Sequence, residues 1–400
     1  MEATIMKILK YVSIIFGLML AIQLPQASAQ QQEKKAEYQI EGKWYGLPDA
    51  KLFPDDYDGP PVVGEHLTRL PNVAVLEPGN RNHDVRIDVV AQEVEVAPGV
   101  RYKAWTFGGA VPGPVLHVRE GDKVNFTMKN RSHEEVSVSQ PAKGGAMFLE
   151  QLQQNNLQKP KAVAQPMLHS MDFHAGTVAA DDKWQNVPPG MAIQFEWIAN
   201  YPGVYIYHCG TPPVLQHMSM GQYGVVIVSP KEGYPTDDQV DKEFAVVQSE
   251  FYLKQTAAVQ DSNLYVPSEK TAGNTLYELD YDAAMKKQPS IVAFNGHQNA
   301  LMNNPLVVEK GDRVRLYMLN VGPNDVASTH VIGAIFDRVW YEGNLENEWR
   351  GMQTVLLGAS NGAVMEFIVP EEGHYVLVDH EMADAEKGAK GLIITKSKSN

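Results

Sequence analysis

An internal repeat of β-type sequence constrains the fold of this chain more than any other feature. REGDKVNFTMKN at 119–130 matches EKGDRVRLYMLN at 309–320, an offset of 190 residues. PGVYIYHC at 202–209 matches EGHYVLVDH at 372–380, so that Cys209 corresponds to Asp379. Apolar and polar residues alternate along these segments, as they do in strands with one buried face. The repeat therefore predicts an all-β protein that consists of two tandem Greek-key β-sandwiches.

The repeat also predicts the domain organisation. We expect a first domain at 72–230 and a second at 240–396, preceded by a proline-punctuated N-terminal extension at 30–71 that has no core of its own. The two copies differ in length at one place. His169 follows Asn130 by 39 residues, whereas the matching histidine of the second copy follows its asparagine by only 10.

The first domain therefore carries an insertion of about 29 residues, within roughly 131–165. Its MFLEQLQQNNLQ stretch at 147–158 has the apolar spacing of a helix. A second short helical pattern covers 269–287, and the remainder of the chain favours strands. Helices should therefore be few and short.

The N-terminus has the pattern of a secretory signal peptide. Lys7 and Lys10 precede the apolar run YVSIIFGLMLAI, and LPQASAQ follows with small residues at the positions that a signal peptidase requires. The apolar run is shorter than the roughly 20 residues needed to span a bilayer. We expect a signal peptide at 1–29, cleavage near Ala29, and an exported or periplasmic mature protein without a membrane span.

Composition narrows the possible functions. The chain has 34 Lys and Arg against 48 Asp and Glu, a formal net charge of −14, whereas nucleic-acid-binding domains concentrate positive charge. Nucleic acid is therefore not an expected partner. Cys209 is the only cysteine, so no internal disulfide can form. The role of Cys209 must therefore be inferred from the residues around it.

Histidines surround Cys209 in a pattern that suggests metal binding. Alternate side chains of a strand face opposite sides, so His169 and His174 should point in opposite directions, with Asp172 on the His174 side. The adjacent residues His208 and Cys209 should also face opposite sides. The simplest pairing places His169 with Cys209 and His174 with His208, which predicts two metal sites joined by one peptide unit.

The two predicted sites differ in ligand chemistry. His169, Cys209 and His217 supply two imidazoles and a thiolate, the donor set of a blue-copper electron-transfer site. His174 and His208 supply imidazoles only, which is typical of a catalytic copper or zinc site with an open position. The third ligand of this second site must come from elsewhere in the sequence.

The chain resembles the two-domain copper nitrite reductases over roughly residues 85–395. The resemblance rests on the motifs WTFGGAVPGP, LHSMDFH, YHCG followed by His217, VAFNG, HVIG and VLVDH, in this order. It implies two cupredoxin domains per chain, a homotrimer, and copper as cofactor, with one type 1 and one type 2 ion per chain. It also implies a dissimilatory reduction of nitrite to nitric oxide and water, as in denitrification, with electrons from a small exported cupredoxin or c-type cytochrome.

The resemblance further implies roles for four residues. His380 would complete the type 2 site with His174 and His208 across a contact between subunits. Asp172 and His330 would be the catalytic pair that delivers protons, and Ile332 would shape the nitrite-binding position. The type 1 site would relay electrons to the type 2 site along Cys209 and His208.

The sequence departs from the family at the axial position of the type 1 site. Where the family has methionine five residues after the second histidine, HMSMGQYG places Gln222. We expect Gln222 to be the axial ligand, with Met220 and then Met218 or an empty axial position as alternatives. An axial amide oxygen would lower the type 1 potential relative to a thioether.

Two other functions compete with nitrite reduction. A two-domain multicopper oxidase of the small-laccase kind would need HxH pairs and an HCHxxxH run, but Gly210 follows Cys209 and the chain contains no HxH. A non-catalytic copper electron carrier would leave Asp172, His330 and His380 without a role. The sequence therefore favours nitrite reduction.

Overall fold

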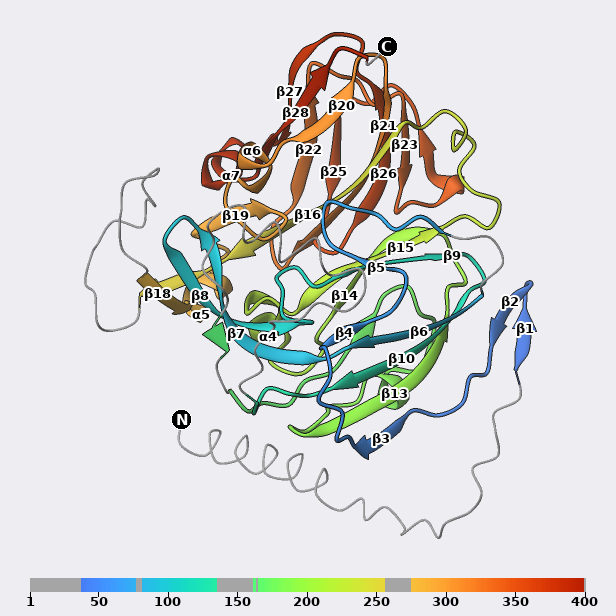
Figure 1. The fold of residues 1–400 in the computed structure, drawn as a ribbon, viewed down its shortest axis with the longest axis vertical. Helices are drawn as coiled ribbons and strands as arrows, with labels where there is room; N and C mark the ends of the chain where they lie inside the picture. The colour runs from blue at the N-terminus through green and yellow to red at the C-terminus, as the bar shows by residue number, and fades with distance from the viewer. Residues whose placement is uncertain (1–36, 77–80, 135–160, 163–164, 256–274, 399–400) are drawn as a thin grey trace, which may run out of the picture. The chain divides into compact units, whose positions relative to one another are not determined.

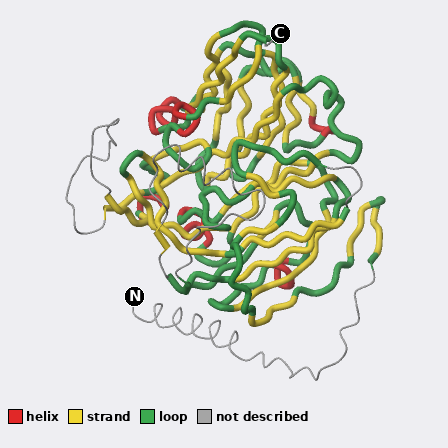
Figure 2. Tube along the Cα trace, in the orientation of Figure 1, coloured by secondary structure: helices red, strands yellow, loops and turns green. Residues whose placement is uncertain are grey.

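The computed structural model describes residues 37–76, 81–134, 161–162, 165–255 and 275–398 (Figure 1). Strands dominate this part of the chain, and its helices are short (Figure 2). None of the helices among the described residues has the length and apolar character needed to cross a membrane. The predicted signal peptide and the predicted helix at 147–158 lie outside the described residues.

The first sandwich consists of two five-stranded sheets. In spatial order, one sheet contains β3 (Lys51–Pro54), β13 (Met191–Ile198), β10 (Lys123–Lys129), β6 (Asn82–Ile87) and β4 (Val62–Val63). The other contains β12 (Asp172–Phe173), β14 (Gly203–His208), β15 (Tyr223–Ser229), β9 (Val115–Arg119) and β5 (Leu67–Thr68).

The second sandwich, orange to red in Figure 1 apart from the yellow β16, has a six-stranded and a five-stranded sheet. The larger sheet contains β19 (Ile291–Phe294), β16 (Lys242–Phe251), β21 (Arg313–Gly322), β26 (Gly362–Ile368), β23 (Arg338–Tyr341) and β24 (Glu348–Trp349). The smaller contains β20 (Leu306–Glu309), β28 (Lys390–Lys396), β27 (Gly373–Asp379), β22 (Ala327–Ile332) and β25 (Thr354–Leu357).

The strand pairing repeats between the two sandwiches. β10 lies antiparallel to β13 and parallel to β6, as β21 does to β26 and β16. β15 lies antiparallel to β14 and parallel to β9, as β28 does to β27 and β20. β10 and β21 begin at Lys123 and Arg313, the matched positions of the sequence repeat.

A further sheet contains strands from both halves of the chain. Its order is β11 (Lys161–Ala162), β7 (Val89–Ala97), β8 (Val100–Phe107), β18 (Thr275–Leu279) and β17 (Leu253–Gln255). Because β8 pairs directly with β18, the structure has no simple cut between the halves, and the boundaries at 72–230 and 240–396 remain predictions.

The expected helix at 269–287 is wrong over part of its length. Residues 269–274 lie outside the described residues; of the others, Thr275–Leu279 forms strand β18 and Tyr281–Met285 is helical, as α5. Tertiary packing overrides the local helical pattern here, because Tyr277 and Leu279 pack against an apolar cluster that includes residues of β7, β8 and β17. The side chain of Asp280 then caps α5 by accepting from the Ala283 amide at 2.9 Å.

Short elements complete the described structure. They are the hairpin strands β1 (Tyr38–Ile40) and β2 (Lys43–Tyr45), the helices α3 (Ala180–Lys183), α4 (Val214–Ser219), α6 (Ala300–Asn303) and α7 (Met382–Lys387), and the 3₁₀ helix η1 (Leu345–Asn347). The N-terminal extension joins the first sandwich rather than standing apart from it. It supplies β3, β4 and β5 to the two sheets, and Leu47 and Leu67 belong to the first core.

Apolar contact joins the two sandwiches. Val204 and Ile206 of β14 belong to one buried cluster with Trp340 and Val364 of the second sandwich. Burying such side chains is the main favourable term in folding, at roughly 25 cal/mol per Å² of apolar surface. The site residues near β14 are therefore held on a firmly packed interface.

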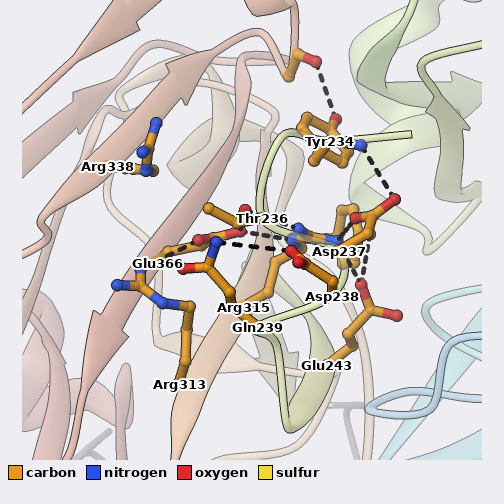
Figure 3. A network of polar contacts seen from close by, with 12 residues as sticks. Tyr234, Thr236, Asp237, Asp238, Gln239, Glu243, Arg313, Arg315, Arg338 and Glu366 are labelled. Atoms are coloured by element: carbon orange, nitrogen blue, oxygen red, sulfur yellow. Dashed lines mark hydrogen bonds and ion pairs between the residues drawn. The ribbon is translucent and has the colours of Figure 1, made fainter. Parts of the chain in front are cut away.

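A polar network fixes the segment that connects the sandwiches (Figure 3). Arg315 Nη1 donates to Asp237 at 2.6 Å, and Arg315 Nε donates to Glu366 at 2.8 Å. Thr236 Oγ1 donates to Glu366 at 2.7 Å, and Tyr234 donates to the Gly343 carbonyl at 2.9 Å. Glu366 is 0% exposed, so these partners compensate a buried charge.

Candidate metal centres

One group of potential metal ligands is buried within the first sandwich. His169 lies just before β12, Cys209 directly follows β14, and His217 lies in α4 between β14 and β15. One ligand atom from each lies within 4.8 Å of the others, and all three side chains are buried. The structure thus brings together the three residues of the predicted type 1 site.

The Cys209 thiol sits among hydrogen-bond donors. The Ser170 amide donates to Sγ at 3.3 Å, and the Cys209 amide donates to the Gln222 carbonyl at 3.2 Å. Burial raises the pKa of Cys209, while hydrogen bonds from Thr211 and Ser170 act in the opposite direction. Such donors stabilise a thiolate once a metal replaces its proton.

The two histidines of this group are suited to metal binding. Burial, with a further contribution from His217, lowers the pKa of His169 to about 3, while the nearby Gln222 side chain opposes this shift. Burial also lowers the pKa of His217. Both imidazoles are therefore neutral at pH 7, the state that binds metals.

The buried polar atoms around this group fit a copper ion. Neither ring nitrogen of His169 and neither amide atom of Gln222 has a hydrogen-bond partner of normal geometry among the described residues. Leaving buried polar atoms unpaired costs free energy unless they serve a ligand. Two imidazoles, a thiol and an amide oxygen are donors that copper accepts in blue-copper sites.

The axial alternatives differ in their surroundings. The Tyr102 hydroxyl donates to the Ser219 carbonyl at 2.9 Å and lies 3.6 Å from the sulfur of Met220, so this thioether faces Tyr102. Met218 packs against the apolar cluster between the sandwiches. Gln222 is 0% exposed and its side chain lies near His169. The packing therefore favours Gln222 over both methionines as the axial group.

Trp105 is a neighbour of the first group that the sequence motifs alone do not single out. Its ring centroid lies 5.3 Å from that of His169 and 4.8 Å from that of His217. Its indole N–H donates to Gln165 at 2.8 Å. The WTFGG motif contains this residue, but only the fold shows that its ring is a wall of the site.

A second group lies on the other side of the same strand. Asp172 pairs with His208 across β12 and β14, and the ligand atoms of Asp172, His174 and His208 all lie within 4.8 Å of one another. The Nε2 atoms of His174 and His208 are 3.0 Å apart. Two imidazole nitrogens that face each other at this distance could both reach one metal ion.

The electrostatics of the second group also fit a metal. Burial of the imidazole, with a contribution from His208, lowers the pKa of His174 to about 4, although the residue as a whole is exposed in the single chain. Asp172 Oδ2 lies 3.6 Å from His208 Nε2. Burial raises the pKa of Asp172, while His208 opposes this shift.

The remaining predicted site residues lie in the second sandwich. His330 and Ile332 belong to β22, and His380 directly follows β27, the neighbouring strand. The ring centroids of His330 and His380 are 5.6 Å apart. His380 belongs to neither group of potential metal ligands that the described residues form, and Ile332 is 50% exposed.

Comparison with known proteins first identifies the class. Sequence models described as multicopper oxidase match residues 88–142 and 154–232. A solved structure described as a multicopper oxidase superposes with a TM-score of 0.58 at 23% identity, covering 83% of this chain and 95% of that one. This similarity shows the fold, a set of cupredoxin-like sandwiches.

The more similar relatives identify the family. The copper-containing nitrite reductase of Neisseria meningitidis serogroup A is 35% identical over 346 residues, 85% of this chain and 77% of that protein. The copper nitrite reductase of Nitrosomonas europaea superposes with a TM-score of 0.60 at 31% identity, over 78% of this chain and 94% of that chain. This chain belongs to the family of copper-containing nitrite reductases.

The family confirms several predictions made from the sequence. The protein is an oxidoreductase, copper is its metal, and nitrite is the substrate that its family implies. The predicted fold, two tandem cupredoxin-like β-sandwich domains, is confirmed by the strand pairing and by the solved relatives. The multicopper-oxidase alternative is disfavoured, because such proteins match at lower identity than nitrite reductases do.

Proposed function

We propose that the protein reduces nitrite to nitric oxide and water with one electron and two protons. The observation that carries this proposal is the placement of the adjacent residues His208 and Cys209, at the end of β14, in two different ligand groups. Because the two residues are adjacent in the chain, a continuous covalent path joins the groups. An electron received at the first group can follow that path to the second.

His169, Cys209, His217 and Gln222 would hold a type 1 copper, and His174, His208 and His380 a type 2 copper, one of each per chain. When bound, copper supplies one-electron redox chemistry at both groups and a Lewis-acidic position for a nitrite oxygen at the second. The burial of the first group excludes water and keeps its donors in place, which favours fast electron transfer.

We propose that the second group is completed by His380 of a neighbouring subunit in a homotrimer. His174 and His380 are both exposed in the single chain, each beside another histidine. Ile332 and Leu356 expose apolar surface on the strands around His330, at 50% and 59%. Exposed apolar side chains beside incomplete ligand groups are typical of a surface that another subunit covers.

Asp172 and His330 would deliver the protons. The reaction takes two protons to release one nitrite oxygen as water, so two donors near the substrate are required. Burial favours a protonated carboxyl at Asp172, which lies beside His208. His330 Nδ1 contacts the Gln353 carbonyl, which orients its other nitrogen away from the strand. Ile332 would restrict the space beside the substrate.

We propose export to the periplasm, with removal of residues 1–29, and reduction by a small exported cupredoxin or c-type cytochrome. The supporting observation is the leader-like composition of the N-terminus. A denitrifying role follows from the proposed product, nitric oxide.

Mixed trimers test the proposal. Subunits with His174→Ala and subunits with His380→Ala, carrying different affinity tags, are produced together and purified on both tags. Each variant alone should lack the type 2 electron paramagnetic resonance signal and nitric oxide production. Mixed trimers should regain about one third of the wild-type activity, because a cyclic trimer with both kinds of subunit has one intact site of three.

The matched control mixes His174→Ala with His208→Ala. Both changes affect the same side of the subunit contact, so no combination rebuilds a site and activity should stay absent. Full activity and type 2 copper in the His380→Ala protein alone would refute the proposed second site.

A further inference from the structure

We propose that Asp379 is a positioning residue that holds His380 and His330 in the arrangement needed for the type 2 site. The inference rests on the proposed function, since it assumes that His380 is a metal ligand. Asp379 occupies the repeat position that Cys209 has in the first domain. The second domain thus has a carboxylate where the first has the thiol.

The Asp379 carboxylate is fully buried and accepts three hydrogen bonds. Its Oδ1 accepts from the backbone amides of Ser328 at 2.9 Å and of Glu381 at 3.0 Å. Its Oδ2 accepts from Gln248 Nε2 at 2.6 Å. Since Asp379 is 0% exposed, water does not compete for these donors, and each bond is stronger than at the surface.

These partners lie on both sides of the proposed ligand. Glu381 follows His380 directly, and the His380 amide donates to the Ser328 carbonyl at 2.8 Å. Asp379 Oδ1 therefore accepts hydrogen bonds from Glu381, the residue after His380, and from Ser328, whose carbonyl accepts from the His380 amide. The backbone of His380 has little freedom to move relative to β22.

The same bond positions His330. Ser328 lies two residues before His330 on β22, so both residues face the same side of the strand. By holding Ser328 against the end of β27, Asp379 sets the separation of the His330 and His380 rings, 5.6 Å between centroids. A single buried group thus fixes both second-domain residues of the proposed catalytic site.

Gln248 connects this arrangement to the opposite sheet. It lies on β16 of the six-stranded sheet, whereas Asp379 ends β27 of the five-stranded sheet. The side-chain carbonyl oxygen of Gln248 has no hydrogen-bond partner among the described residues. In Asp379→Asn, the side-chain oxygen can accept from the two backbone amides. Its NH₂ group can donate to the side-chain oxygen of Gln248 once the Gln248 amide has rotated.

Copper titration of Asp379→Ala and Asp379→Asn tests the inference. Type 2 occupancy is followed by electron paramagnetic resonance, and the type 1 site by its visible absorption. We expect Asp379→Ala to weaken type 2 copper binding by roughly 10- to 100-fold, as loss of groups that orient metal ligands does, without a change in type 1 absorption. Asp379→Asn should stay within about threefold of wild type, because it keeps the hydrogen bonds.

Glu366→Ala is the matched control for general loss of stability. Glu366 is also a fully buried carboxylate of the second sandwich, but its partners are Thr236, Arg313 and Arg315 in the connecting network (Figure 3). This variant should leave type 2 affinity unchanged. If Asp379→Ala binds type 2 copper like wild type, if its type 1 and type 2 signals fall together, or if Asp379→Asn behaves like Asp379→Ala, the inference is wrong.

His380→Ala in the same titration separates this inference from the proposed function. If His380→Ala keeps type 2 copper, the proposed function fails. If His380→Ala loses that copper while Asp379→Ala keeps wild-type affinity, only the positioning role of Asp379 fails.

Discussion

The two sandwiches share one strand pairing, but only the first encloses a buried group of potential metal ligands among the described residues. In the first, His169, Cys209 and His217 form a buried group that a single chain completes. In the second, His330 and His380 lie together at an accessible sheet end, outside any complete group in the described structure. If the proposed function holds, the same fold supports a closed electron-transfer site in one domain and half of a shared catalytic site in the other.

One repeat position accounts for much of this difference. Cys209 places a polarisable sulfur where a metal can bind it, whereas Asp379 uses its two oxygens to bond Ser328, Glu381 and Gln248. A carboxylate that is saturated by protein donors is poorly available to a metal. The second domain therefore offers a metal no thiolate at this repeat position, and its carboxylate is occupied by protein donors.

Cys209→Ser should have the largest effect, because it removes the thiol that distinguishes the first domain from the second. Serine keeps the size of the side chain but offers no thiolate, so the type 1 absorption should disappear. Nitric oxide formation with a protein electron donor should fall almost to zero, while the type 2 resonance signal remains. Activity with such a donor close to that of wild type would contradict the assignment of Cys209 to the electron path.

Asp172→Asn tests the role of the first domain in proton delivery. Asparagine preserves the shape of the side chain but cannot release a proton, so kcat should fall by roughly 10²-fold or more while both copper signals stay unchanged. His330→Asn should have a similar effect from the second domain. An unchanged kcat and pH profile in both variants would show that the protons come from other groups.

The stability of the copper-free protein should depend on pH through buried histidines of the first sandwich. Burial lowers the pKa of His169 to about 3 and of His117 to about 4, whereas an unfolded histidine titrates near 6.5. The contribution of these neutral histidines to the free energy of unfolding is therefore fully present above about pH 6.5 and decreases as the pH falls toward 4. The decrease is at most about 1.4 kcal/mol per histidine and pH unit. Thermal unfolding in the presence of a copper chelator measures this loss.

His117→Gln is the control for the pH prediction. His117 lies outside both metal groups and bonds the Ala74 carbonyl and the Ser229 hydroxyl. Removing it should reduce the slope of melting temperature against pH without affecting copper binding. A melting temperature that does not change between pH 6.5 and 4.5 would show that these histidines are not neutral in the folded state.

Gln222→Met refines the comparison with the family and has the smallest expected effect. A thioether stabilises Cu(II) less than an amide oxygen does, so the type 1 potential should rise, by roughly 60 mV if the one-electron equilibrium changes tenfold. Met220→Leu is the control, because the sulfur of Met220 faces Tyr102 and its loss should leave the potential unchanged. A redox titration that gives the same potential for Gln222→Met and wild type would exclude Gln222 as a ligand.

The sequence by itself predicted the fold class, the repeat, the first ligand group, and the presence of His174 and His208 in a second one, whereas His380 lies outside both groups in the described structure. Strand periodicity is local, so alternation around His169, His174 and the His208–Cys209 pair suffices to sort their side chains onto two faces. Only the tertiary structure decided which distant groups meet these residues. Neither the wall that Trp105 forms nor the partner of the Met220 sulfur follows from periodicity.

The strand at Thr275–Leu279 and the hydrogen bonds of Asp379 both depend on packing between segments that are distant in the sequence. A short segment with weak helical spacing adopts the structure that buries its apolar side chains, and that depends on what the rest of the fold presents to it. A buried carboxylate likewise binds whichever donors the packed strands bring within reach. Local pattern thus predicted most of the strands and the chemical character of the sites, while packing between distant segments decided the contacts and, at Thr275–Leu279, the element itself.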